Sequence, residues 1–316
     1  MPRLFPGRAG EHLRSRLLLL FLLLTLAGCA GSFPGSFREH PGPERVFIDS
    51  VPFYAQEEYQ CGPAALAMLL TWSGREITPD QLTDQVYSPD LQGSLQPAII
   101  AATRRHGRLA HPIAGGEALL AELAAGHPVL VLQNLGLSWF PRWHYAVVIG
   151  YDRDQNSFML HSGAQAATSL SARVFANTWR RSGSWGLLVL APEQIPATAS
   201  EETFLAAVVG LEQASQWSAA SRGYAAALAR WPASFVAWMG RGNTLYLLGD
   251  PAGAEEAFRR ALSLQPDNGP ALNNLALALA ATGRRAEALT VIRQAIELGG
   301  PLEEQFQQTL EEIGEE

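Results

Sequence analysis

Lysine is absent from this chain of 316 residues, so all 23 of its basic residues are arginines. A phosphate-binding loop of the Walker type needs a lysine, and so does an enzyme that forms a Schiff base with its substrate, so both classes are excluded. Acidic residues outnumber basic ones, which gives a formal charge of −7 with no basic stripe. Such a chain is a poor binder of nucleic acid, and we expect no nucleic-acid partner.

Cysteine is scarce as well, because the chain has only Cys29 and Cys61. Structural zinc sites with four ligands usually need more cysteine than this. The histidines show no metal-binding spacing such as His-Glu-x-x-His. We therefore expect no metal and no other cofactor.

The residues that are present favour two folded domains. With 47% hydrophobic and 17% charged residues, the chain is long enough for two separate cores and is not disordered. We predict a targeting segment at 1–28, a flexible tether rich in Gly, Pro and Ser at 29–45, a first domain at 46–191, a linker at 192–201 and a second domain at 202–316.

The first 28 residues have the layout of a signal peptide. Arginines precede an apolar run at 17–24, which is too short to span a bilayer stably and leads into Leu26-Ala27-Gly28-Cys29. This segment resembles a bacterial lipobox. The resemblance implies that Cys29 is acylated after cleavage and that a periplasm-facing lipoprotein is anchored to the outer membrane, because no Asp follows Cys29. The alternative is an ordinary cysteine of a signal peptide.

If Cys29 carries lipid, Cys61 has no disulfide partner, and a lone thiol in an oxidising compartment indicates a function. Cys61 ends a polar turn, and Gly62-Pro63 opens an apolar run. We predict a helix that runs to about Ser73 with Pro63 at its first position, where a missing N–H costs nothing. A helix N-terminus favours a thiolate, so Cys61 is a candidate nucleophile. The alternative is a small buried side chain at the end of a core helix.

A second stretch, residues 143–152, has the pattern of a buried strand with His144 at its start. Around these two stretches we predict an entry strand near 45–53, helices beginning near 78, 95 and 116, and strands at 128–133, 157–161 and 185–190. Helices that come first and strands that follow are an α+β pattern. In such a fold, the helix bearing Cys61 can pack against the sheet bearing His144.

Residues 51–190 resemble the papain-like peptidases that process double-glycine leader peptides, the bacteriocin-processing family in particular. The nucleophile segment of that family is matched by Cys61-Gly62-Pro63-Ala64-Ala65-Leu66, and its base segment by His144-Tyr145-Ala146-Val147-Val148-Ile149-Gly150. The resemblance implies that Cys61 is the nucleophile, that His144 is the base and that Gln56 lines the oxyanion hole. The alternatives are a core histidine held by backbone groups and a solvated turn glutamine.

The third catalytic position departs from that family. Where the family has Asn-Asp-Pro, this chain has His161-Ser162-Gly163. Ser162, with His161 as the alternative, is therefore the candidate that orients the imidazole, although neither does so as strongly as a carboxylate. An imidazole within reach of the thiol can take its proton, and a glutamine amide can donate to the developing oxyanion.

Beyond the linker the composition changes to Ala, Leu, Arg and Glu, with a period of 34 residues between Pro232 and Pro266. Two units match the offsets of a tetratricopeptide repeat through Trp238, Gly242, Gly249, Ala254, Phe258 and Ala261 and then through Leu272, Leu275, Gly283, Ala288, Ile292 and Ala295. Residues 204–232 form a degenerate first unit. Such repeats usually bind a peptide or a partner on a concave surface, and the alternative is a stabilising helical cap.

The sequence therefore predicts an α+β papain-like peptidase domain followed by an all-α tetratricopeptide-repeat domain. Three functions from different classes fit it. The first is a lipid-anchored cysteine peptidase that hydrolyses a peptide bond in a peptide or protein substrate, with the repeats recruiting substrate or a protein partner. The second is a papain-like module that binds a peptide without cutting it. The third is an amidase or acyl transferase of the cell envelope.

Overall fold

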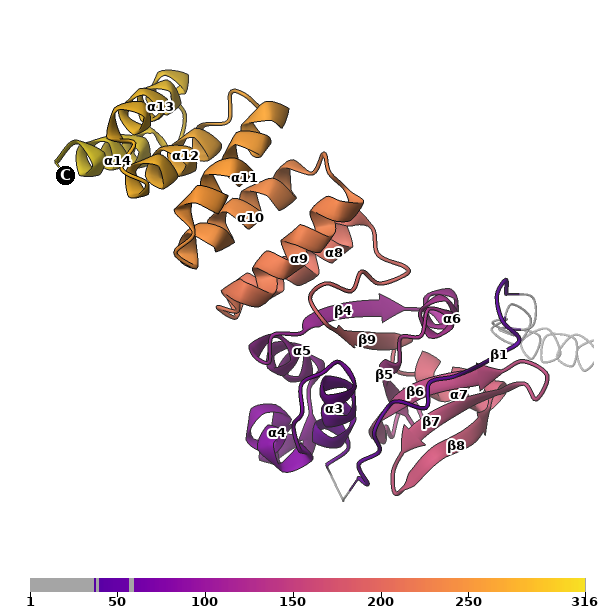
Figure 1. Cartoon of the computed structure of the whole chain (residues 1–316). Helices are drawn as coiled ribbons and strands as arrows, with labels where there is room; N and C mark the ends of the chain where they lie inside the picture. Colours follow the sequence, from indigo (N-terminus) through magenta and orange to yellow (C-terminus); the bar gives the residue numbers. More distant parts are fainter. Residues whose placement is uncertain (1–36, 38–39, 57–59, 316) are drawn as a thin grey trace, which may run out of the picture. The chain divides into compact units, whose positions relative to one another are not determined.

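The computed structural model describes residues 37, 40–56 and 60–315 (Figure 1). The segment His40–Glu316 forms one compact unit. The predicted signal segment and Cys29 lie outside the described residues. In the part of the chain that is described, no helix is long and apolar enough to cross a membrane.

The N-terminal domain is built on an antiparallel sheet. Its seven strands, counted over the described residues, have the order β4-β9-β5-β6-β7-β8, and β1 pairs with β6. Their bounds are β1 (Arg45–Phe47), β4 (Leu109–Ala114), β5 (Val129–Asn134), β6 (Trp143–Asp152), β7 (Ser157–Ser162), β8 (Gln165–Ser171) and β9 (Trp185–Leu190). A Cβ at Gly150 of β6 would lie 2.1 Å from the Val46 carbonyl oxygen, so only glycine fits where β1 meets β6.

The helix predicted at the nucleophile segment is α3 (Cys61–Trp72), and it is buried almost throughout. Its buried residues run from Gly62 to Leu70 without one polar side chain, which is the pattern of a helix inside a core. The helix contacts β5, β6 and β9 of the sheet. It begins at Cys61, so Pro63 is its third residue and not its first. The missing N–H of Pro63 still falls in the first turn, where these groups have no helical partner.

The remaining helices of this domain are α4 (Pro79–Val86), α5 (Gln96–Arg105), α6 (Gly116–Ala124) and α7 (Ala172–Arg180), with the short elements β2 (Tyr87–Ser88), η1 (Pro89–Leu91) and β3 (Gly93–Ser94). The α+β prediction is confirmed. The sequence did not predict β4, β8 or α7. β8 is polar and mostly exposed, and β4 carries Pro112, so neither has the apolar alternation from which a strand is predicted.

The C-terminal part of the chain is entirely helical, as predicted. Its helices are α8 (Glu201–Gln213), α9 (Trp217–Arg230), α10 (Phe235–Leu247), α11 (Pro251–Leu264), α12 (Gly269–Ala281), α13 (Arg285–Leu298) and α14 (Glu303–Glu315), and consecutive helices pack on one another (Figure 1). A Cβ at Gly242 would lie 2.3 Å from the Phe258 ring, so the small residue allows α10 and α11 to approach closely.

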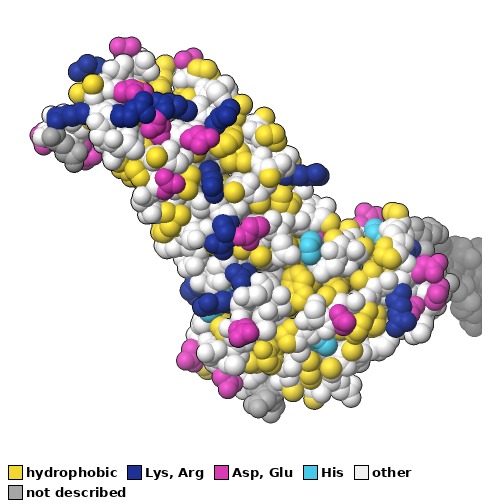
Figure 2. All heavy atoms as spheres, viewed as in Figure 1, with side chains coloured by type: hydrophobic (Ala, Val, Ile, Leu, Met, Phe, Trp, Pro, Cys, Tyr) yellow, Lys and Arg dark blue, Asp and Glu magenta, His cyan; other side chains and the backbone are white. Residues whose placement is uncertain are grey.

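Charged side chains of both signs gather over this helical part of the chain (Figure 2). Arg259 and Arg284 each form ion pairs with Glu255 of α11 and with Glu287 of α13. These pairs join consecutive repeats. Glu255 is buried, whereas the side chains of Glu287 and of both arginines are more than 40% exposed, so the pairs with Glu287 contribute little by themselves.

The first repeat helix is attached to the N-terminal domain, because α8 contacts β4 and α5. At this junction the buried Glu122 accepts hydrogen bonds from the Ala197 N–H at 3.2 Å and from the N–H and hydroxyl of Thr198 at 2.7 and 2.6 Å. Burial opposes the charge, but these bonds and the ring of His127 hold the pKa of Glu122 below its ordinary value. The junction therefore contains a buried, charged hydrogen-bond centre.

Candidate functional site

Cys61 is the first residue of α3, so its sulfur lies at the positive end of a 12-residue helix. The backbone N–H groups of Tyr145, Gly62 and Cys61 itself lie close enough to the sulfur to lower the pKa of the thiol. Gly62 allows the helix to approach β3, because a Cβ there would lie 2.2 Å from the Ser94 hydroxyl oxygen. The start of α3 is therefore packed between β3 and β6.

His144 lies at the start of β6, next to Tyr145, and its Nε2 is 2.8 Å from the Ser162 hydroxyl oxygen. His161 is bound elsewhere, since its Nε2 donates to the Val51 carbonyl at 3.1 Å and its Nδ1 accepts from the Ala167 N–H at 3.0 Å. Of the two candidates for the third position, the structure brings only Ser162 to His144.

Burial shifts the pKa values of the thiol and of the imidazole in opposite directions. Burial raises the pKa of Cys61 despite the nearby backbone N–H groups, and burial lowers the pKa of His144. Within the described residues, no hydrogen bond joins the Cys61 sulfur to the His144 ring. Both shifts favour a neutral thiol beside a neutral imidazole, in contrast to the thiolate expected from the helix position. The reason is that loss of water around the sulfur outweighs the favourable helix end.

Gln56 fills the space between β6 and the residue that follows β7. Its backbone N–H donates to the Gly163 carbonyl at 3.0 Å, and its side-chain oxygen accepts from the Gly163 N–H at 2.8 Å. Its side-chain nitrogen donates to the Tyr145 carbonyl at 3.2 Å. Because an amide nitrogen carries two hydrogens, one N–H is left after this bond. The backbone of Tyr145 thus accepts a hydrogen bond from the Gln56 amide and lies near the sulfur.

Three further residues shape this region, and the sequence analysis missed them. The Tyr145 hydroxyl donates to the Ser94 carbonyl at 3.1 Å, while the Ser94 hydroxyl is buried and has no hydrogen-bond partner among the described residues. Gln133, which pairs with His144 across β5 and β6, donates to Thr178 of α7 at 2.7 Å. Only Tyr145 lies inside a sequence motif. The positions of Ser94 and Gln133 near the site could not be predicted without knowing how the strands pair.

A short hairpin, residues 135–142, joins β5 to β6 immediately before Trp143 and His144. Large apolar side chains on it and at its base are between 50% and 81% exposed, namely Leu135, Leu137, Trp139, Phe140 and Trp143. The side-chain oxygen of Asn134 accepts from the N–H groups of Gly136 and Arg142 at 2.9 and 3.0 Å. The exposed apolar side chains are therefore carried on a hydrogen-bonded turn next to the histidine.

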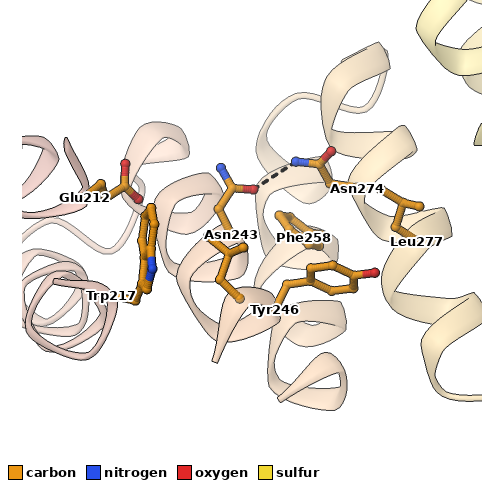
Figure 3. Close-up of a pocket in the computed structure, with 8 residues that line it drawn as sticks. Glu212, Trp217, Asn243, Tyr246, Phe258, Asn274 and Leu277 are labelled. Carbon is orange, nitrogen blue, oxygen red and sulfur yellow. Dashed lines mark hydrogen bonds between the residues drawn. The ribbon is translucent and has the colours of Figure 1, made fainter. Parts of the chain in front are cut away.

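A second feature is a cavity of about 380 Å³ among the repeat helices, away from Cys61 (Figure 3). It is lined by Glu212 of α8, Trp217 of α9, Asn243, Tyr246 and Leu247 of α10, Phe258 of α11, and Asn274 and Leu277 of α12. The Asn274 side chain donates to the Asn243 side chain at 2.9 Å. The cavity has the size of a small ligand site and combines apolar walls with a few polar groups.

Comparison with known families agrees with this division of the chain. The model of the Peptidase C39 like family matches residues 48–186, and two tetratricopeptide-repeat models match residues 235–268 and 271–299. The chain carries a C39-like domain followed by tetratricopeptide repeats. The two-part fold and the repeats predicted from the sequence are thereby confirmed. The match to the C39-like family is broader than the bacteriocin-processing peptidases that the motifs resemble.

Solved structures resemble the two parts separately. A C39-like peptidase from Bacillus anthracis has 18% identity and a TM-score of 0.40, covering 47% of this chain and 98% of its own. The TPR2B domain of yeast Sti1 in its pHsp70 complex has 19% identity and a TM-score of 0.35, covering 36% of this chain and 96% of its own. Likenesses this distant carry no functional argument. Among curated proteins, none matches the chain.

Proposed function

We propose that this protein is a cysteine peptidase that hydrolyses a peptide bond through Cys61 and His144, with the repeats recruiting its substrate or a partner. One observation carries the proposal. Within a C39-like domain, the helix that begins with Cys61 packs against β6, and the backbone N–H of Tyr145, the residue that directly follows His144, lies close enough to the thiol to lower its pKa. A nucleophile at a helix N-terminus and a base on the adjacent strand are the arrangement that thiol catalysis needs.

In the proposed reaction, the Cys61 sulfur attacks the carbonyl carbon of the scissile peptide while His144 accepts the thiol proton. The remaining N–H of the Gln56 amide donates to the oxyanion that forms. His144 then gives its proton to the leaving amine, which leaves a thioester on the sulfur. Water attacks this thioester with His144 as base, releasing the carboxylic acid and restoring the thiol. Since burial favours a neutral thiol and a neutral imidazole, proton transfer accompanies the attack and does not precede it.

Ser162 takes the third catalytic position in this proposal, as a positioning residue. Its hydroxyl oxygen, 2.8 Å from His144 Nε2, fixes the ring so that the other ring nitrogen is left for the thiol. A hydroxyl carries no negative charge, so it stabilises the imidazolium of the reaction less than a carboxylate would. We therefore expect a slower enzyme than a peptidase with Asp at this position.

A polypeptide substrate is supported by two surfaces. The exposed hairpin 135–142 places apolar side chains beside the base, where they can contact the side chains of an extended substrate. The repeats supply a cavity among α8 to α12, and stacked helical repeats commonly bind partner polypeptides. The narrower proposal of a bacteriocin-processing type of peptidase rests on the motif residues alone.

The membrane anchor is a further part of the proposal. It rests on the lipobox-like residues that end at Cys29, which lie outside the described residues. Lipidation at Cys29 would hold the C39-like domain at the periplasmic side of the outer membrane. Cys29→Ser should leave the protein unlipidated and shift it out of the membrane fraction, and an unchanged fraction would count against the anchor.

A peptide-binding module without hydrolysis is the second candidate. It is favoured by the neutral third position at Ser162, together with the raised pKa of Cys61 and the lowered pKa of His144. Both candidates bind a peptide at the same surface, but only the peptidase forms a thioester with it.

The deciding experiment is incubation of the protein with a pooled peptide library, followed by mass spectrometry of new termini. We expect cleaved products with the native chain and none with Cys61→Ala, with His144→Ala close to the background. If the native chain retains peptides without producing new termini, the binding module replaces the peptidase. If the Cys61→Ala variant cleaves as well as the native chain, the site is misassigned.

A further inference from the structure

The cavity among the repeats has a distinct order of side chains. In Figure 3, Glu212 and Trp217 lie at one end, the amides of Asn243 and Asn274 lie in the middle with Phe258 and Tyr246, and Leu277 lies at the other end. Its lining contains one carboxylate and no basic residue. A ligand that complements this lining therefore carries positive charge at one end and apolar surface at the other.

Glu212 is the group that sets this charge preference. It is half-buried, and within the described residues no arginine pairs with it, in contrast to Glu255 and Glu287, which each pair with arginines. Burial raises the pKa of its carboxyl group, and the nearby Tyr224 hydroxyl acts in the opposite direction. A carboxylate that has lost water and has no cationic partner gains most from a cation brought by a ligand.

Trp217 adds a second preference for a cation. Its indole lies beside the Glu212 carboxylate in Figure 3, at the same end of the cavity. An aromatic face attracts an ammonium or guanidinium group through its quadrupole, and tryptophan does so more strongly than tyrosine or phenylalanine. A carboxylate and an indole together fit a planar guanidinium especially well.

The middle of the cavity fits a main chain. The Asn274 amide donates to the Asn243 oxygen, and the Asn273 amide donates to the Asn274 oxygen at 3.2 Å. Within the described residues the Asn243 amide nitrogen forms no hydrogen bond, so it is left to donate to a carbonyl. Leu277, which is half-buried, continues the apolar surface beyond the amides in Figure 3. A peptide with a basic side chain at one end and an apolar side chain at the other would place its main-chain carbonyls at the amides, and so would complement all three parts of the cavity.

We propose that this cavity binds a polypeptide segment of the recruited substrate or partner, with an arginine or lysine side chain between Glu212 and Trp217 and an apolar side chain toward Leu277. The inference rests on the proposed recruitment by the repeats and names the chemistry of what is recruited. It selects against acidic segments, because a second carboxylate beside Glu212 would be repelled.

The test is fluorescence anisotropy with three pools of dye-labelled peptides, random except for a fixed central Arg, Gln or Glu. We expect the native full chain to bind the Arg pool at least about tenfold more tightly than the Gln pool, and the Glu pool most weakly. Glu212→Gln should abolish this preference while keeping the size and polarity of the side chain. Glu256→Gln, which removes the same charge from an exposed position on α11, should leave the preference intact.

Trp217→Leu is a second variant that keeps an apolar wall and should reduce the preference for the Arg pool by a smaller factor than Glu212→Gln. Equal binding of the three pools, or a preference that survives Glu212→Gln, would overturn the assignment of the cation site while leaving recruitment by the repeats in place. If no pool binds the native chain, recruitment of polypeptides by the repeats fails together with this inference.

Discussion

The candidate active site and the cavity of the repeats are assembled in different ways. The candidate active site draws Gln56 and Cys61 from one stretch and His144 and Ser162 from two strands much further along the chain, and strand pairing and helix packing bring these stretches together. The cavity draws its residues from successive helices, such as Asn243 of α10 and Asn274 of α12. The first site therefore depends on strand register throughout a domain, whereas the second depends on packing between neighbours. Single substitutions should abolish hydrolysis when they fall in the active site. In the cavity of the repeats, they should weaken peptide recognition only in part.

The change with the largest expected effect removes the nucleophile. Cys61→Ala should lower the rate of peptide hydrolysis by more than about 10⁴-fold, because the other groups act only through the thioester. Hydrolysis of the most rapidly cut library peptide, followed by mass spectrometry, measures this. Glu212→Gln serves as the contrast, since it should alter which peptides are cut first and leave the rate on a short neutral peptide unchanged.

The close packing at the start of α3 gives the next largest effect. Gly62→Ala places a methyl group against the Ser94 hydroxyl, so it should lower the free energy of unfolding by roughly 1 to 3 kcal/mol and displace the thiol. Gly314→Ala in α14 has open space around its Cβ and should be neutral or stabilising by up to about 1 kcal/mol. Urea unfolding of both variants tests this. If both variants lose the same free energy of unfolding, the start of α3 is not more closely packed than α14, and this comparison between the two domains is wrong.

The hairpin beside His144 should affect substrate binding more than chemistry. Trp139→Ser combined with Phe140→Ser should raise KM about 10- to 30-fold with little change in kcat or in stability, because both side chains are exposed. Leu302→Ser, 41% exposed near the C-terminus, is the matched control and should change neither parameter. A fall in kcat with constant KM would mean that the hairpin positions the histidine and does not contact substrate.

Ser162 should give the smallest of these effects. Ser162→Ala removes one neutral hydrogen bond to His144 and should lower kcat/KM by about three- to tenfold. Ser162→Asp should raise the rate at neutral pH, because a carboxylate stabilises the imidazolium formed during the reaction. Kinetics of the two variants on one peptide decide between a positioning role and none. If neither variant differs from the native chain, Ser162 does not position the ring.

The sequence was sufficient for features set by local pattern. The helix at Cys61, the strand at His144 and the repeat period of the C-terminal part all followed from composition and spacing, and the two-part fold is confirmed. The choice between His161 and Ser162 could not be made in this way. The pairing of β7 with β8 shifts register between Leu160 and Ser162, and such an irregularity decides which neighbouring side chain faces the histidine.

The cavity of the repeats was beyond sequence reasoning for a similar reason. Glu212 and Trp217 belong to the degenerate first unit, where the tetratricopeptide offsets give no position to compare. Their proximity to Asn243 and Asn274 depends on how α8 to α12 stack. Without that stacking, an isolated Glu in a helical sequence is interpreted as an ordinary solvated charge. The raised pKa of Cys61 was missed because the helix end was visible in the sequence, while the burial of the sulfur was not.

The central claim, that His144 activates Cys61, is tested most directly by the rate of Cys61 alkylation with iodoacetamide as a function of pH. The imidazole is an effective base only when neutral, so the native rate should rise as pH increases through the lowered pKa of His144, below about 6.5. It should rise again at high pH as the thiol itself ionises at its raised pKa. His144→Ala should remove the lower inflection and keep the upper one. A single inflection near the ordinary thiol pKa of about 8.5 in both proteins would contradict the account.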